Sequence, residues 1–94
     1  MEPFTAAQAG EYLKQVPGWK LAMIDLAISR RFKFKNFKQA LEFVNKVGKI
    51  AEDENHHPDI AVGWGYVAIT CSTHAIKGLS ENDFILASKI NTLT

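Results

Sequence analysis

The chain has 94 residues, of which 47% are hydrophobic and 22% are charged. This length allows a single domain spanning residues 1–94, and the composition is that of a globular protein, not a disordered one. The net charge of +1 and the one cysteine exclude strong steering toward nucleic acid or an anionic membrane, an internal disulfide and a thiolate-built zinc site. Because no secretion signal and no apolar stretch near the ~20 residues of a membrane span are visible, we expect a cytoplasmic protein.

A helix is predicted near the start of the chain. Thr5 can cap it, and Gln8 lies three residues later, where the partner residue of a capping box belongs. Pro17 and Gly18 then end it, because both residues disrupt helical geometry. Apolar side chains recur at helical spacing between these signals, at Ala9, Tyr12, Leu13 and Val16.

Residues 19–34 predict two strands of an antiparallel pair. The second strand is half-buried, because apolar and polar side chains alternate along it. A turn near residues 23–25 folds residues 19–22 back as its neighbour. Arg30 interrupts the apolar row and requires a polar partner or an edge position. The side chains expected to face the core are Leu26, Ile28, Phe32 and Phe34.

The longest predicted helix follows Asn36 and runs to about Glu54. Asn36 is its cap, and Gln39 occupies the capping-box position. Charges at four-residue spacing predict ion pairs on its solvent side, and apolar residues form a stripe toward the core. The charged set is Lys38, Glu42 and Lys46, and the stripe comprises Phe37, Ala40, Leu41, Val44, Val47, Gly48 and Ala51.

Pro58 excludes helical geometry at residue 57, and the segment after it predicts a β-hairpin and a third helix. Apolar residues alternate over residues 60–64 and 67–71, and Trp64 lies between two glycines at the turn. Ser80 caps the last helix, and Asp83 completes a capping box there. The expected buried positions of this helix are Leu86, Ala87, Ile90 and Leu93.

The element order predicts an α+β fold. The elements run α-β-β-α-β-β-α, and the short connections near residues 23–25 and 64 make each strand pair antiparallel. A four-stranded antiparallel sheet with helices packed on one face follows. Because a chain this short buries only about 60–65% of its unfolded surface, we expect it to gain stability by pairing with copies of itself.

Three histidines provide the side chains best suited to chemistry. His56 and His57 lie just after the long helix, and His74 follows the last strand. If the two strands between them pair as a hairpin, the outer strand ends meet at one edge of the sheet and bring the three histidines together. Histidine exchanges protons near neutral pH more readily than other side chains. The sequence therefore predicts a histidine acid–base site.

Other interpretations of these residues are open from the residues alone. A His-His-Pro turn can be a solvated helix end, Asp83 can serve only its capping box, and Trp64 can be an aromatic platform or a subunit contact. The three histidines and a carboxylate could bind a metal, but adjacent histidines converge poorly on one ion, so we expect none. A solvent-facing strand explains the basic residues between 30 and 38, so we expect no nucleic-acid and no membrane partner.

The histidines belong to a longer arrangement of residues. An acidic residue precedes His-His-Pro by three intervening positions, an aromatic residue follows six positions after the proline, a histidine follows ten later, and an aspartate lies beyond it. These residues are Glu52, His56, His57, Pro58, Trp64, His74 and Asp83. The arrangement resembles the signature of the pterin-4a-carbinolamine dehydratases. The likeness covers nearly the whole chain. It extends to Pro17-Gly18-Trp19, Phe32-Lys33-Phe34, Asn36-Phe37, Ser72-Thr73-His74 and Gly78-Leu79-Ser80.

The resemblance implies an enzyme, a carbon–oxygen lyase acting on a small-molecule pterin. Members of the family convert 4a-hydroxytetrahydropterin, including 4a-hydroxytetrahydrobiopterin, into quinonoid dihydropterin and water. This reaction recycles the pterin cofactor of aromatic amino acid hydroxylases. The resemblance implies no metal and no cofactor of the protein's own, and it implies a homodimer or a homotetramer.

The resemblance also implies roles for individual residues. His57 and His74 are the expected proton-transfer pair, and His56 is expected to position the pterin ring. Glu52 and Asp83 would orient histidines or nearby backbone, and Trp64 would wall the pocket or contact a subunit. The implied catalytic set is therefore His56, His57 and His74, with Glu52, Pro58, Trp64 and Asp83 in supporting roles.

A second function is compatible with the same resemblance. Animal members of the family also act as dimerisation cofactors of a homeodomain transcription factor, through a helical surface. The chain could therefore be a protein-interaction module that has a protein partner and little or no catalysis. The complete histidine set favours the enzyme, because a pure binding module does not require it.

Overall fold

The computed structural model describes residues 2–94 and has the predicted α+β fold. One short 3-10 turn is added before the last helix. Among residues 2–94, no helix combines the length and the apolar character needed to cross a membrane. The elements are α1 Ala6–Leu13, β1 Lys20–Ala22, β2 Ala27–Lys33, α2 Phe37–Glu54, β3 Asp59–Gly63, β4 Tyr66–Cys71, η1 His74–Ile76 and α3 Glu81–Asn91.

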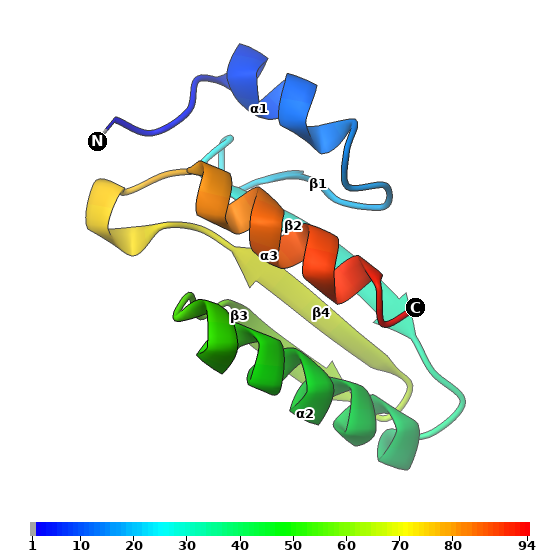
Figure 1. Cartoon of the computed structure of the whole chain (residues 1–94). Coiled ribbons are helices and arrows are strands. Elements are labelled where there is room, and N and C mark those ends of the chain that lie inside the picture. The colour runs from blue at the N-terminus through cyan, green and yellow to red at the C-terminus, as the bar shows by residue number, and fades with distance from the viewer. Residues whose placement is uncertain (1) are drawn as a thin grey trace.

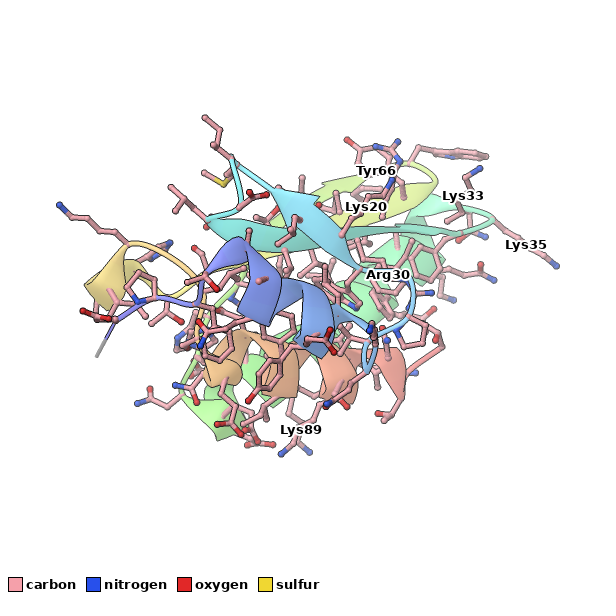
Figure 2. The ribbon with its side chains drawn as sticks, turned by 90° about the horizontal axis from the view of Figure 1, so that it is seen from above. Lys20, Arg30, Lys33, Lys35, Tyr66 and Lys89 are labelled. Atoms are coloured by element: carbon pink, nitrogen blue, oxygen red, sulfur yellow. The ribbon has the colours of Figure 1, made fainter. Side chains whose placement is uncertain are left out.

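The sheet has four antiparallel strands in the order β1-β2-β4-β3. β4 is the last strand along the chain, yet it lies between β2 and β3. All three helices pack on one face of the sheet (Figure 1). Figure 2 shows Arg30 on this helix side, whereas Tyr66 and Lys33 lie on the opposite, uncovered side.

The core lies between the sheet and the helices. Alternation along β2 and β4 directs one row of side chains toward the helices. Burying a large apolar side chain contributes about 1.5–3 kcal/mol, so this layer supplies much of the stability. The buried residues include Ile28 and Phe32 of β2, Val67, Ile69 and Cys71 of β4, and the predicted Leu86, Ala87 and Ile90 of α3.

Three predicted core positions are exposed instead. Leu26 lies in the turn before β2, where its N–H donates to the Met23 carbonyl, so the buried alternation begins only at Ala27. On α2, Phe37 and Leu41 are exposed although they belong to the predicted apolar stripe. α2 lies over β3 at the edge of the sheet, so only part of the stripe meets the core (Figure 1). The buried side chains of α2 are Ala40, Phe43, Val47 and Ala51.

The helix caps follow the sequence with one change. Thr5 and Gln8 form the predicted capping box at α1. Asn36 caps α2 by accepting from the Gln39 N–H at 2.9 Å. The Gln39 side chain does not complete the box, because it accepts from the N–H of Lys35, the residue before the cap.

Charged side chains find partners that differ from the predicted ones. Among residues 2–94, no ion pair joins the charged residues expected to pair along α2. Exposed ion pairs contribute little, so their absence has a small effect. Lys89 of α3 instead pairs with Glu54 at the end of α2. Arg30 has the polar partner that its position required, because its Nη1 donates to Asn91 Oδ1 at 2.7 Å.

Candidate functional site

The end of α2 positions two of the histidines. Asn55 adopts a left-handed conformation, with φ of 51°, and turns the chain away from the helix axis. Pro58 excludes helical geometry at His57, and β3 begins at Asp59. His56 and His57 therefore lie between the end of a helix and the start of a strand.

The β3–β4 hairpin brings the third histidine to the same end of the sheet. Asp59 pairs with Thr70, so the start of β3 lies beside the end of β4. His74 follows β4 and begins η1. In Figure 1 the end of α2 and η1 both lie at the left of the sheet, as the predicted hairpin requires.

A fully buried carboxylate organises this end of the molecule. Asp83, in the first turn of α3, has an exposed fraction of 0%. Its Oδ1 accepts from His56 Nε2 at 2.6 Å. Its Oδ2 accepts from the Thr73 hydroxyl at 2.8 Å and from the Ser80 N–H at 3.0 Å. Three donors thus satisfy a charge that would be costly to bury alone.

The bond to Asp83 fixes the orientation of the His56 imidazole. An ionised carboxylate only accepts hydrogen bonds, so Nε2 carries a proton and Nδ1 is the ring nitrogen left for another partner. The His56 side chain is 16% exposed, so part of the ring can be reached from solvent. This arrangement suits an imidazole that must meet a ligand in one orientation.

Two hydroxyls connect the turn of His74 to the same carboxylate. The Thr73 hydroxyl donates its single proton to Asp83, so Ser80 is the donor in the 2.7 Å contact between the Ser80 and Thr73 hydroxyls. Thr73 directly precedes His74. The hydrogen bonds therefore tie the backbone beside His74 to the Asp83–His56 pair.

His57 has a separate carboxylate partner. Its Nε2 bonds to Oε2 of Glu52, five residues earlier on α2. The His57 side chain is 57% exposed, and Glu52 is also exposed, so this pair can exchange protons with solvent. Among the hydrogen bonds of residues 2–94, none joins His74 to His56 or His57.

Trp64 lies away from the other predicted site residues within one chain. It occupies the turn between β3 and β4 and is 72% exposed. β4 has six residues that each rise about 3.3 Å, which puts this turn roughly 20 Å from the end that bears His74. Pro58 lies at the histidine end. In a single chain Trp64 is therefore available to a second copy or another partner.

Thr73 and Ser80 both bond to Asp83, but the sequence predicts no site role for either. Both lie in segments that resemble the family, and Ser80 is predicted only as a helix cap. Hydroxyl residues beside His74 and three positions before Asp83 were the available signal. Their link to Asp83 depends on folding, because Thr73 and Asp83 lie on different elements.

The buried cysteine near the site, Cys71, is poorly suited to act as a nucleophile. Burial raises the pKa of the Cys71 thiol, and the negative charges of Asp83 and Asp59 raise it further. A thiol that stays protonated is a poor nucleophile and a poor metal ligand. Within residues 2–94, no three His, Cys, Asp or Glu side chains lie close enough together to hold a metal ion.

Comparison with known proteins identifies the family. A family model described as pterin 4 alpha carbinolamine dehydratase matches residues 2–93. The chain belongs to this family. A relative that carries the family's name, from Halorhodospira halophila, is 53% identical over 91 residues, covering 97% of this chain and 84% of that protein. Another, from Methylococcus capsulatus, is 48% identical over 91 residues, covering 97% and 80%.

Solved structures share the fold of this dehydratase-family chain. A Brucella melitensis protein described as a transcriptional coactivator/pterin dehydratase matches with a TM-score of 0.91 and 33% identity, covering 98% of each chain. A pterin dehydratase-like protein, identified as a RuBisCO assembly factor in the alpha-carboxysome, matches with a TM-score of 0.69 and 22% identity, covering 84% of this chain and 92% of its own. At that identity the second likeness shows the fold alone.

Proposed function

We propose that this protein dehydrates 4a-hydroxytetrahydropterin to quinonoid dihydropterin and thereby serves the recycling of a pterin cofactor for aromatic amino acid hydroxylases. The bond between Asp83 and His56 carries the proposal, because a helix cap does not require a fully buried carboxylate that also orients an imidazole. Membership of the dehydratase family supports it, as does the placement of His57 and His74 at the same end of the sheet.

The reaction needs two proton transfers. The C4a–O bond breaks as the N5 lone pair forms the C4a=N5 double bond, and the hydroxyl leaves as water only if it receives a proton. The proton on N5 must be removed. One histidine donates to the oxygen and another accepts from N5, so one proton enters and one leaves the protein's imidazoles. Each such transfer typically contributes about 10²–10⁴-fold to the rate.

We assign the two transfers to His57 and His74. Both side chains are exposed, so each can restore its protonation state with water between turnovers. His56 is held by Asp83 and mostly covered, which suits it to positioning the ring through Nδ1. Glu52 would orient His57 in the same way as Asp83 orients His56.

The direct test is the dehydration rate of freshly generated 4a-hydroxytetrahydropterin. His57→Ala and His74→Ala should lower kcat by about 10²–10⁴-fold, and both variants should unfold in urea as the wild type does. His56→Ala should raise KM more than it lowers kcat. A wild-type protein no faster than the uncatalysed reaction would refute the proposal, and loss of activity with EDTA would point to a metal instead.

A second candidate function is association with other chains. Phe37 and Leu41 present an exposed apolar strip on α2, and the Brucella melitensis relative is described as a coactivator as well as a dehydratase. We propose that this strip forms a homodimer or homotetramer contact and could receive a protein partner. The double variant Phe37→Ser, Leu41→Ser should sediment as a smaller species than the wild type. A stoichiometric partner found by pull-down, together with negligible turnover, would favour the interaction module over the enzyme.

A further inference from the structure

Residues 2–5, which precede α1, form an arm beside the loop that carries His74. This His74 loop comprises residues 73–78 and contains η1. The Phe4 N–H donates to the Leu79 carbonyl at 2.8 Å, so the arm runs alongside the chain that leads from the loop into α3. Figure 1 shows the arm at the same end of the molecule as η1. Folding therefore joins the arm to the candidate site, although the two are far apart in the sequence.

Pro3 of the arm packs directly against Gly78. A Cβ on residue 78 would lie 2.6 Å from the Cβ of Pro3, which is closer than the two atoms can approach. Gly78 does not have a positive φ, so its backbone would accept a side chain. The close approach of Pro3 is therefore the reason that this position requires glycine.

Gly78 in turn closes the His74 loop. The Thr73 N–H donates to the Gly78 carbonyl at 2.7 Å, and the Gly78 N–H donates to the Thr73 carbonyl at 3.4 Å. These bonds join the two ends of the loop. His74 is the first residue between them, and Lys77, with φ of 54°, is the last. A displacement of Gly78 is therefore passed to the backbone of His74.

Phe4 fixes the arm to two helices. Its ring stacks on that of Tyr12, with centroids 4.8 Å apart, and on that of Phe84, with centroids 6.0 Å apart. Tyr12 belongs to α1, and Phe84 directly follows Asp83 on α3. Aromatic pairs of this kind stabilise a structure more than their buried area alone. The arm can therefore act as a rigid support for the loop.

His74 depends on its backbone for its position more than the other two histidines do. His56 bonds to Asp83 and His57 bonds to Glu52, so each of these rings is held by a carboxylate. Among the hydrogen bonds of residues 2–94, none reaches the His74 ring, and this residue is exposed. Whatever holds the His74 loop therefore also places the imidazole.

We propose that Pro3 and Phe4 are positioning residues for His74, which they hold in the candidate site by bracing its loop at Gly78 and Leu79. The inference rests on the proposed dehydratase function, in which His74 transfers a proton. Misplacing a catalytic group by about 1 Å can cost about 10²-fold in rate, so a smaller shift should lower kcat by about tenfold. KM should change little, because His56, which is proposed to position the pterin ring, keeps its bond to Asp83.

The first test uses the contact between Pro3 and Gly78. Gly78→Ala should lower kcat for dehydration of 4a-hydroxytetrahydropterin by about tenfold and leave KM within about twofold. Adding Pro3→Gly removes the opposing ring and should restore most of the rate. Gly10→Ala is the matched control, because a Cβ at Gly10 on α1 meets nothing within 4 Å. An unchanged kcat for Gly78→Ala, or no recovery in the double variant, would overturn the inference.

The second test loosens the arm itself. Phe4→Ala removes the ring that contacts Tyr12 and Phe84 and should lower kcat as Gly78→Ala does. Phe4→Leu keeps an apolar side chain at the same place and should restore most of the rate. A Leu variant as slow as the Ala variant would contradict the anchoring role of this side chain.

Amide hydrogen exchange separates positioning from a general loss of stability. The Thr73 N–H is held by Gly78, whereas the His56 N–H donates to the Ala51 carbonyl at 3.1 Å, away from the arm. In Phe4→Ala and Gly78→Ala, the Thr73 amide should exchange several-fold faster while the His56 amide is unchanged. Equal acceleration of the two amides would indicate general destabilisation and overturn the inference.

The outcomes also separate this inference from the proposed function. A faster Thr73 amide with an unchanged kcat would overturn the positioning role and leave the dehydratase standing. If the wild type does not dehydrate the pterin, the proposed function fails, and NMR of the histidine rings still tests the arm. A His74 ring signal that shifts in Phe4→Ala and Gly78→Ala, with the His57 signal unchanged, would support the inference. An unchanged His74 signal would overturn it.

Discussion

At the scale of single residues, Asp83 serves a helix cap and the candidate site with different oxygens. Oδ2 accepts from the Ser80 N–H, which caps α3, and from the Thr73 hydroxyl. Oδ1 accepts a hydrogen bond from His56 Nε2. A buried carboxylate can fill both roles because each oxygen accepts more than one hydrogen bond.

Asp83→Asn tests how far the site depends on this carboxylate. The amide keeps one accepting oxygen but turns an NH₂ group toward a donor, so a buried donor loses its partner at a cost of about 1–3 kcal/mol. Urea unfolding should show this loss, and the dehydration rate should fall with it. Glu81→Gln, an exposed change in the same turn, should alter neither quantity. An Asn variant as stable as the wild type would contradict this account of the buried donors.

Cys71 should make the protein less stable as the pH rises in the alkaline range. Burial and the charges of Asp83 and Asp59 raise the pKa of this thiol in the folded protein, whereas an unfolded chain has a thiol pKa of about 8.5. Above that pH the unfolded chain releases a proton that the folded protein retains. The contribution of this thiol to the free energy of unfolding is therefore fully present below the thiol pKa of the unfolded chain. It is lost as the pH rises above that value, by up to about 1.4 kcal/mol per pH unit.

The measurement is urea unfolding from about pH 8.5 to pH 10. Wild-type stability should fall more steeply over this range than that of Cys71→Ala, whatever the difference between the two proteins at pH 7. Equal slopes would show that the thiol loses its proton as readily in the folded protein as in the unfolded chain.

Some single residues of the candidate site could be predicted from the sequence, and others could not. The spacing of Ser80 and Asp83 predicts the cap, and the family pattern includes Asp83. No local pattern predicts that Thr73 donates to Asp83, because that bond forms only when η1 and α3 are folded together.

At the scale of elements, the β3–β4 hairpin has a glycine that faces an aromatic ring. Gly63 pairs with Tyr66, and a Cβ at residue 63 would lie 2.1 Å from Cε1 of that ring. The Arg31 guanidinium also lies over the Tyr66 ring, 3.9 Å from its centroid, and restricts the movement of the ring. The sequence predicts Gly63 as a turn residue, but it belongs to β3 and provides space for the ring.

Gly63→Ala should therefore destabilise the hairpin. Forcing the ring aside should cost about 1–3 kcal/mol by urea unfolding. The cost should shrink in a Tyr66→Ala background, because the clash is then removed, and a double-mutant cycle measures the difference. Gly48→Ala on α2 is the matched control, since a Cβ there meets nothing within 4 Å and should be neutral or stabilising. Equal costs in both backgrounds would exclude the ring as the cause.

α2 shows what periodicity can and cannot predict. The apolar spacing locates the helix and its end at Glu54, both of which are confirmed. Phe37 and Leu41 were expected in the core and are exposed, whereas Phe43 is buried. Spacing defines which side chains share a face of a helix, but the extent of the sheet beneath that face depends on strand order.

Strand order could also be predicted from the sequence only in part. Both hairpins are predicted from short turns and alternating side chains, and both are confirmed. The central pairing of β2 with β4, where Ile28 meets Cys71, joins residues far apart in the chain. Local sequence contains no signal for that contact.

At the scale of the whole molecule, Asn91 joins three segments at the end of α3. Its Oδ1 accepts from Trp19 Nε1 at 2.8 Å and from Arg30 Nη1 at 2.7 Å. Its Nδ2 donates to the Pro17 carbonyl at 3.1 Å. The sequence predicts that Arg30 needs a partner, but one that lies 61 residues away cannot be found from local pattern.

Asn91→Ala should weaken the whole fold. It leaves the indole N–H and a half-buried guanidinium short of an acceptor, which should cost about 1–3 kcal/mol in the free energy of unfolding. Urea denaturation followed by tryptophan fluorescence would report the loss, since Trp19 is one of the donors. Asn82→Ala, near the opposite end of the same helix and exposed, should cost much less. Similar losses in the two variants would indicate an effect on the helix and not on the network.

Under the proposed dehydratase function, the unequal burial of the histidines has a consequence for related proteins that have lost catalysis. His57 and His74 are exposed and can be replaced at little expense to folding. His56 cannot, because its loss would leave Asp83 one donor short inside the protein. In relatives that have lost catalysis, we therefore expect His56 and Asp83 to be retained and the residues at positions 57 and 74 to vary. Among relatives that act only by binding other proteins, this difference would identify those that descend from enzymes.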